Sequence, residues 1–146
     1  MKAFEQISHT ADLQYRVYGK TKHDLFRNAL IGMFQLLGPS ASGCKREQDL
    51  LVCKQLPNRW FVDLEASDEE SLLVDFLSYA VYLSDVHNEA YLDATIDLLT
   101  ATQIKAYLYG IVVQRFEVVE VKAVTYHNLH IHQVDGIWQT DIVLDI

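Results

Sequence analysis

Two segments with one-sided apolar faces constrain the fold of this chain more than any other feature. Apolar residues between positions 25 and 37 recur at i, i+1, i+4, i+5, i+8, i+9 and i+12, and positions 72–81 repeat the start of that spacing. Each set forms one broad stripe along a helix. The residues are Leu25, Phe26, Ala29, Leu30, Met33, Phe34 and Leu37, then Leu72, Leu73, Phe76, Leu77, Ala80 and Val81. Such helices must be covered by a sheet or by each other.

Both helices have start signals in the sequence. Thr21 is followed three residues later by Asp24, and Ser67 by Glu70, which is the spacing of a capping box. Gly38-Pro39 follows the first stripe and is a stop signal. We therefore expect Thr21 and Ser67 to cap the two helices.

Alternating residues predict strands around these helices. From Asp12 to Tyr18 apolar and polar residues alternate, which is typical of a half-buried strand. Leu50–Cys53 and Trp60–Leu64 have the length and composition of short strands, and Ala90–Tyr109 fits helix or strand, of which we favour strand. The prediction is an α+β fold, with two amphipathic helices packed on a largely antiparallel sheet.

The C-terminal segment predicts a hairpin. Asp135-Gly136 is a strong signal for a two-residue type I′ turn, here between Val118–Val134 and Ile137–Asp145. With that turn, the numbers of opposing residues sum to 271, so Tyr126 would face Asp145. This register collects most apolar residues on one face and leaves Asp145 at a strand end on the more polar face.

Size and charge narrow the functional classes. The 146 residues, 16.8 kDa in mass, suit a single domain spanning 1–146. The net charge of −8 disfavours a freestanding nucleic-acid binder, which needs clustered Lys and Arg. Neither a membrane-spanning run nor a signal-peptide core is visible, so we expect a cytoplasmic protein. Cys44 and Cys53 are then expected to be reduced thiols, because reducing compartments disfavour the disulfide they could form.

Three carboxylates are candidate ligands for a hard cation. Asp12 begins a strand, Asp145 ends one, and Ile146 carries the terminal carboxylate. Oxygen donors of this kind suit Mg²⁺, Mn²⁺ or Ca²⁺. Their spacing does not show that they converge, and solvated acids at strand ends would look the same.

The other reactive residues have ordinary explanations. His130 and His132 would share a strand face, but His127 would lie on the other, so a zinc site lacks converging donors. Lys122 could be a buried amine, although an exposed strand lysine is more common. The sequence contains no glycine-rich phosphate loop and no nucleophile elbow. Taken alone, these residues identify no enzyme.

The two ends of the chain resemble the archease family. Ser8-His9-Thr10-Ala11-Asp12 resembles the His-Thr-Ala-Asp motif that opens archease proteins. Val121–Leu129 is similar to the family's Lys-Ala-x-Thr-Tyr-His segment, and Leu144-Asp145-Ile146 to its terminal hydrophobic-Asp-hydrophobic ending. The resemblance extends over nearly the whole chain. The sequence departs from the family pattern at Ser8, Gln14 and Ser78-Tyr79-Ala80.

The resemblance implies a fold, a partner and a site. The fold would be of the SHS2 type, and the protein would be a non-enzymatic activator of an RtcB-type RNA-splicing ligase, promoting its guanylylation by GTP and its multiple turnover. Asp12, Asp145 and the terminal carboxylate of Ile146 would hold a divalent metal ion. His9 would be a neighbour, and Lys122 and His127 match further motif positions. A chaperone-like modulator of a tRNA methyltransferase and a stand-alone metal-dependent phosphotransfer enzyme are the alternatives.

Overall fold

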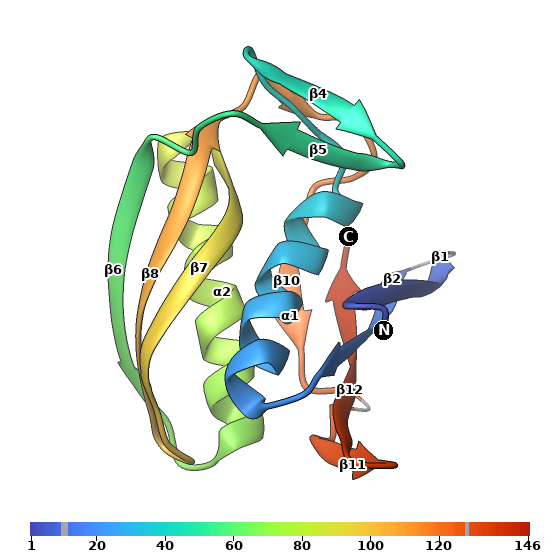
Figure 1. The fold of residues 1–146 in the computed structure, drawn as a ribbon, viewed down its shortest axis with the longest axis vertical. Coiled ribbons are helices and arrows are strands. Elements are labelled where there is room, and N and C mark those ends of the chain that lie inside the picture. The colour runs from blue at the N-terminus through green and yellow to red at the C-terminus, as the bar shows by residue number, and fades with distance from the viewer. Residues whose placement is uncertain (10–11, 128) are drawn as a thin grey trace.

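A computed structural model describes residues 1–9, 12–127 and 129–146. Two larger antiparallel sheets enclose a helix between them, and a small hairpin covers one end (Figure 1). In the described residues the helices are α1 (Lys22–Leu36) and α2 (Glu69–His87). The strands are β1 (Phe4–His9), β2 (Asp12–Gly19), β3 (Pro39–Ser40), β4 (Cys44–Glu47), β5 (Leu50–Cys53), β6 (Asn58–Glu65), β7 (Glu89–Leu99), β8 (Gln103–Val112), β9 (Arg115–Phe116), β10 (Ala123–Thr125), β11 (His132–Val134) and β12 (Ile137–Asp145).

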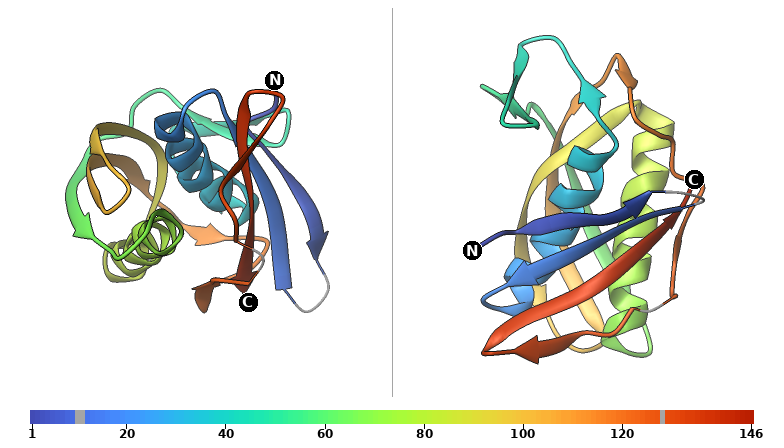
Figure 2. Two further views of the ribbon diagram at one scale, coloured as in Figure 1. Left: turned by 90° about the horizontal axis from the view of Figure 1, so that it is seen from below. Right: turned by 90° about the vertical axis from the view of Figure 1, so that its right-hand side faces the viewer.

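Helix α1 is the centre of the molecule. It contacts β2 of the five-stranded sheet (β1-β2-β12-β10, with β11 also paired to β12) and β7 of the three-stranded sheet (β6-β8-β7). Figure 2 shows α1 between the two sheets and α2 beside it, against the three-stranded sheet and β10. The predicted α+β fold is confirmed, and the breadth of the first apolar stripe is explained, because α1 is covered on two sides. None of the described helices is long and apolar enough to cross a membrane.

The alternation predicted from Asp12 to Tyr18 is confirmed in β2. Leu13, Tyr15 and Val17 are fully buried, and the Tyr15 hydroxyl donates a hydrogen bond to the carbonyl of Ala29 in α1 at 2.8 Å. Leu50–Cys53 and Trp60–Leu64 are also strands, and Ala90–Tyr109 falls in the β7–β8 pair. Alternate burial thus decides which face of β2 packs on α1.

The predicted cap of α1 is confirmed, and the predicted cap of α2 is wrong by one residue. Thr21 accepts a hydrogen bond from the backbone N–H of Asp24, as expected. At α2 the cap is Asp68 instead of Ser67, and its carboxylate accepts from the N–H of Ser71 at 2.7 Å. An aspartate is as good a cap as a serine and adds a favourable charge at the positive end of the helix.

The C-terminal hairpin follows the predicted register only near its turn. His132–Val134 pair with Ile137–Gln139 as expected. The residues before β11 leave the sheet, and β10 pairs with β12 in a register displaced by three residues from the predicted one. Ala123 therefore lies opposite Asp145, and the predicted Tyr126–Asp145 pair is wrong. Ile131 is buried and its N–H bonds to Glu70 of α2, so packing on the helix interrupts the strand. Asn128 lies outside the described residues.

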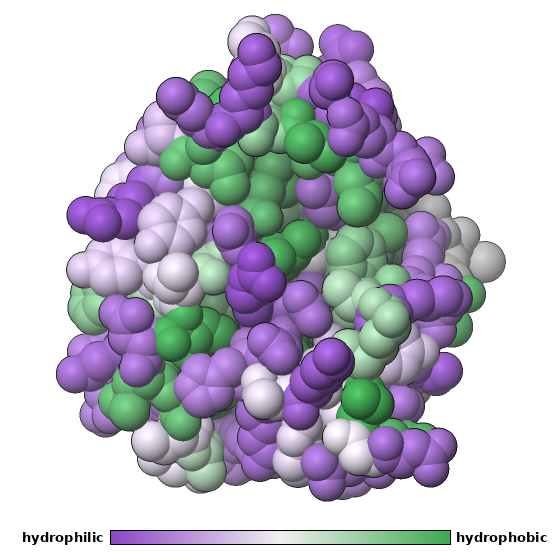
Figure 3. All heavy atoms as spheres, in the orientation of Figure 1, coloured by the Kyte–Doolittle hydropathy of each residue, from purple (hydrophilic) through white to green (hydrophobic). Residues whose placement is uncertain are grey.

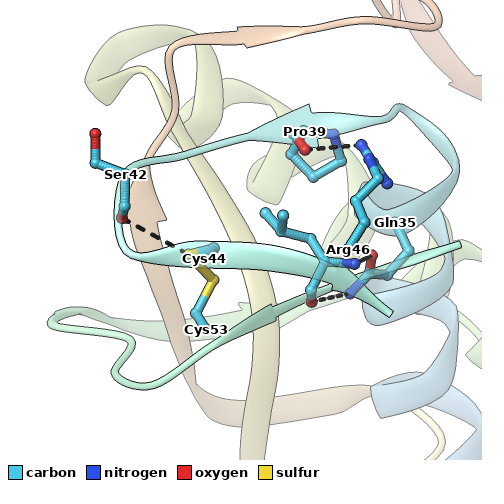
Figure 4. Close-up of a disulfide and its surroundings, with 7 residues drawn as sticks. Gln35, Pro39, Ser42, Cys44, Arg46 and Cys53 are labelled. Carbon is cyan, nitrogen blue, oxygen red and sulfur yellow. Dashed lines mark hydrogen bonds between the residues drawn. A yellow bond between two sulfur atoms is a disulfide. The ribbon is translucent and has the colours of Figure 1, made fainter. Parts of the chain in front are cut away.

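The expectation of reduced cysteines is wrong in this structure. Strands β4 and β5 form a hairpin in which Cys44 and Cys53 are directly opposite, with 4.2 Å between their Cα atoms, and they form a disulfide (Figure 4). The turn residues Gln48 and Asp49 both have positive φ, as a two-residue hairpin requires. The sequence gives no clear signal for this turn because neither position is glycine.

Candidate functional site: an acidic pair at the sheet edge

The ladder between β2 and β12 places two aspartates opposite each other. Leu13 pairs with Leu144, and both side chains are fully buried, so this rung sets the register. The next rung pairs Asp12 with Asp145. Side chains on directly opposed residues have their Cβ atoms about 4.5–5.5 Å apart, so the two carboxylates share one small region of the sheet edge.

A second charged pair on the same ladder differs from the Asp12–Asp145 rung because its charges are opposite. Arg16 lies opposite Asp141 and donates two hydrogen bonds to its carboxylate, at 2.7 and 3.0 Å. Those bonds raise the pKa of the Arg16 guanidinium above its ordinary value. Within the described residues, the carboxylates of Asp12 and Asp145 make no hydrogen bond or ion pair. The ladder thus neutralises one acid and leaves two like charges opposed at its end.

The start of β10 and the chain terminus lie at the same edge. The backbone N–H of Lys122 donates to the carbonyl of Asp145 at 2.8 Å, and the Lys122 side chain is exposed. Ile146 follows Asp145 and is partly buried against the core. Three distant segments therefore converge at the acidic pair, and they contain Lys122 and Ile146 as well as the two aspartates.

The two histidines implied by the resemblance are placed differently. The backbone of His9 pairs with Leu13, which brings the end of β1 next to Asp12, while Thr10 and Ala11 between them lie outside the described residues. His127 is exposed in a turn after β10, and β10 runs away from Asp145. The structure thus brings the His9 backbone to the edge and does not bring His127 there.

His130 and His132, which the sequence predicted on one strand face, lie next to each other at the β11–β12 hairpin. The rings of His130 and His132 are stacked, with their centroids 5.2 Å apart. Among the side chains that the structure describes, which exclude those of residues 8–11 and 128, no three from His, Cys, Asp or Glu are grouped closely enough to hold a metal ion. A site at the acidic pair would therefore need a further donor, such as the terminal carboxylate of Ile146.

The donor set at the edge fits a hard cation. Two aspartate carboxylates with a neighbouring terminal carboxylate offer only oxygen atoms, which suit Mg²⁺, Mn²⁺ or Ca²⁺ better than a soft metal. A cation would also relieve the repulsion between the opposed charges. Asp145 is exposed, so such a site would be accessible from outside the molecule.

A buried carboxylate that the sequence analysis missed is structural. Glu89 is 4% exposed and accepts hydrogen bonds from Asn58, Trp60 and Tyr91. Burial, together with the bond to Glu89, raises the pKa of the Tyr91 hydroxyl. The three side chains that donate to Glu89 are neutral, and no sequence pattern marks the position.

Comparison with known proteins places the chain in a family. Residues 4–146 match the archease protein family (MTH1598/TM1083). The chain belongs to the archease family. Among curated relatives, it is 30% identical to the archease of Methanosarcina barkeri and 32% identical to that of Methanosarcina mazei, over 99% of this chain and 97% of each relative.

Solved archease-family structures share the fold. The solution structure of protein 1598 of Methanobacterium thermoautotrophicum superimposes with a TM-score of 0.64 at 24% identity, over the full length of both chains. The crystal structure of a Thermotoga maritima protein described as an archease and possible chaperone gives a TM-score of 0.60 at 18% identity, covering 97% of this chain and 96% of that one. The archease fold therefore extends over the whole chain, with the acidic pair at one edge.

Proposed function

We propose that this archease-family protein acts as a protein cofactor of an RtcB-type RNA-splicing ligase and is not itself an enzyme. It would promote guanylylation of the ligase by GTP and allow multiple turnover. The observation that carries the proposal is the opposition of Asp12 and Asp145 at an exposed sheet edge, where the two motifs of the family resemblance meet.

The acidic pair would hold a divalent cation. Asp12, Asp145 and the terminal carboxylate of Ile146 would be its ligands, and Mg²⁺, Mn²⁺ and Ca²⁺ are the candidates. When bound, the cation would supply positive charge for phosphate oxygens. The side chains of this chain would orient the cation, and the exposed Lys122 would add a positive charge near the same edge.

The charge of the chain supports docking on a basic partner in the cytoplasm. A net charge of −8 complements a ligase cleft that must be basic to bind RNA. Steering between opposite charges raises the association rate and is weakened by salt. Direct binding of nucleic acid by this chain is not part of the proposal.

Guanylylation of the cognate ligase tests the proposal. The ligase is incubated with GTP and Mn²⁺, with and without this protein, and the rate and number of turnovers are measured. We expect acceleration by the wild type, loss of acceleration with Asp12→Ala and Asp145→Ala, and full acceleration with Asp97→Ala. Asp97 is a matched control because it is an exposed aspartate on β7. Unchanged acceleration by both variants at the acidic pair would disprove the mechanism.

The same experiment separates the alternatives. The description of the Thermotoga maritima relative as a possible chaperone favours a chaperone-like second candidate function. The family resemblance implies a tRNA methyltransferase as the partner for it. That function predicts no effect on a competent ligase and binding that does not require the carboxylates. A stand-alone phosphotransfer enzyme, with His9 or His127 as acid or base, predicts phosphate transfer by the purified protein with Mg²⁺ or Mn²⁺ alone.

A further inference from the structure

The β4–β5 hairpin carries a disulfide that solvent can reach. Cys44 and Cys53 are both partly exposed, although they also pack against the edge of the core. The hairpin projects from the end of α1 (Figures 1 and 4), and hydrophobic side chains gather below it on the face shown in Figure 3. A disulfide at such a position is accessible to thiols in solution, unlike one enclosed in a core.

Two hollows in the surface meet at Cys53. One, of about 310 Å³, is lined by both cysteines together with Lys45 and Lys54. The other, of about 370 Å³, is lined by Cys53 and Lys54 and extends toward Tyr109 and Asp93, whose carboxylate is paired with Arg27 at 2.7 Å. Each volume is in the range that holds a small organic molecule. A small thiol can therefore approach the sulfur atoms from a preformed depression.

The charges around the hollows favour an anionic thiol. Lys45 Nζ lies 3.2 Å from Glu47, and both side chains are largely exposed. Lys54 makes no hydrogen bond or ion pair with any residue that the structure describes. An ammonium group at the mouth of the hollow attracts a carboxylate on the incoming thiol and also stabilises a thiolate.

We propose that the Cys44–Cys53 disulfide is a thiol–disulfide exchange site for a small thiol that carries carboxylate or phosphate groups. The reaction is reversible and connects the hairpin to the pool of such thiols. It is independent of the ligase function proposed above.

The exchange is a two-step transfer of two electrons. A thiolate attacks Cys44 Sγ, the disulfide breaks, and its electron pair leaves on Cys53 Sγ as a thiolate. A second thiolate attacks the sulfur of the bound thiol and releases Cys44. Two molecules of thiol are thereby oxidised to one small disulfide, while the protein disulfide is reduced to two thiols.

The surroundings of Cys44 select Cys53 as the leaving sulfur. The carbonyl oxygen of Ser42 lies 3.8 Å from Cys44 Sγ (Figure 4). A carbonyl oxygen disfavours a thiolate at that distance and can accept a hydrogen bond from a thiol. Cys53 is the neighbour of Lys54 and lines both hollows, so its thiolate is the better stabilised of the two.

The hairpin stays attached when the disulfide opens. The Gln35 side chain accepts a hydrogen bond from the Leu51 N–H at 2.8 Å and donates one to the Leu51 carbonyl at 3.1 Å. Leu51 itself is buried, and Arg46 donates to the carbonyl of Pro39 at 2.9 Å. These contacts tie the hairpin to the end of α1, so the two thiols remain close enough to reoxidise.

The test uses the oxidised full-length protein with glutathione as the anionic probe and 2-mercaptoethanol as the neutral one. Samples are quenched with acid, alkylated, and analysed by intact mass and peptide mapping, while circular dichroism monitors the fold. We expect a glutathione adduct on Cys44, then the dithiol, with an unchanged spectrum. Reoxidation with glutathione disulfide should restore the starting mass.

The lysine variants test the pocket separately from the sulfur chemistry. Lys54→Ala should slow both reactions, because the leaving Cys53 thiolate loses a stabilising charge. The reaction with glutathione should be slowed about fivefold more than the reaction with 2-mercaptoethanol, as expected for one further lost charge contact in water. Lys2→Ala, at an exposed lysine that pairs with Glu5, is the matched control and should affect neither rate.

Three outcomes would overturn the proposal or a part of it. A disulfide that stays oxidised at every glutathione ratio while the protein is folded would exclude the exchange. Equal slowing of both thiols by Lys54→Ala would exclude the anionic pocket. An adduct on Cys53 would overturn its assignment as the leaving sulfur.

Discussion

Charged residues that face each other on the β2–β12 ladder attract at one rung and repel at another. Arg16 and Asp141 satisfy each other across the strands, and Asp12 and Asp145 oppose like charges at the end of the same ladder. Like charges directly across a sheet are destabilising. The acidic pair is therefore a position where stability is lower unless a cation is bound.

Removing one charge of the acidic pair should stabilise the metal-free protein. We expect Asp12→Asn to raise the free energy of unfolding by about 0.2–1 kcal/mol in the presence of a chelator. Asp141→Asn should lower it, because Arg16 then loses its partner. Urea unfolding measures both. Added Mn²⁺ should stabilise the wild type and Asp141→Asn but not Asp12→Asn, and a reversed pattern would contradict the proposed ligand set.

Loss of the buried Glu89 carboxylate should lower the free energy of unfolding. Glu89→Ala leaves the buried donor of Tyr91 and the partly buried donors of Asn58 and Trp60 without their acceptor. We expect a loss of about 2–3 kcal/mol in the free energy of unfolding. Glu89→Gln keeps one acceptor oxygen and should lose less. Equal losses in urea unfolding would show that hydrogen bonding at this position is unimportant.

At the scale of elements, turns and caps locate the secondary structure. The β4–β5 and β11–β12 hairpins both use two-residue turns with positive φ, at Gln48-Asp49 and at Asp135-Gly136. Only the second has a glycine, which adopts this conformation without a steric penalty. The first turn therefore forms at a cost that the rest of the hairpin offsets.

The two hairpins make a matched pair of variants. Asp49→Gly should raise the free energy of unfolding by up to about 1 kcal/mol, because φ at this position is 67°. Gly136→Ala should lower it by a similar amount through conformation alone, since an added Cβ would contact nothing within 4 Å. Thermal unfolding of both variants measures the difference. A loss of stability in Asp49→Gly would show that the Asp49 side chain has a role of its own.

The cap of α2 should make that helix sensitive to acid. The hydrogen bond from the Ser71 N–H lowers the pKa of Asp68 in the folded state. A carboxyl group with a lowered folded pKa contributes stability above its unfolded pKa of about 4 and loses it as the pH falls through the folded pKa. Asp68→Asn keeps a capping oxygen without the charge. The melting temperature of the wild type should therefore be higher than that of Asp68→Asn at pH 7, and the difference should vanish in acid. Thermal unfolding at both pH values measures it. A difference that does not change with pH would exclude the charge as its cause.

At the scale of the whole molecule, one helix organises two sheets and a hairpin. Helix α1 packs on β2 and β7, and its last turn holds β5 through Gln35. Contacts from one element to three others make opening of the core cooperative, while the hairpin depends on few contacts.

Loss of the Gln35 contact should release the hairpin without unfolding the core. In Gln35→Ala, amide hydrogens of β4 and β5 should exchange faster, because the Leu51 backbone loses both of its hydrogen bonds to α1. Exchange in α2 and β8 should be unchanged. Hydrogen-exchange mass spectrometry distinguishes this result from a uniform increase, which would indicate global destabilisation.

Local periodicity by itself determined much of this protein. The stripes of α1 and α2, the alternation in β2 and the turn at Asp135-Gly136 are all readable because neighbouring residues share one environment. The motifs at the two chain ends also identify the family. They single out Asp12 and Asp145, although not their relation in space.

Only the tertiary structure decided which segments contact each other. The burial of Leu13 against Leu144 sets Asp12 opposite Asp145, and the packing of Ile131 on α2 interrupts the predicted C-terminal strand. The hairpin register brings Cys44 to Cys53. Each of these results depends on contacts between segments whose pairing no local pattern encodes, because register across a sheet is chosen by the packing of the whole core.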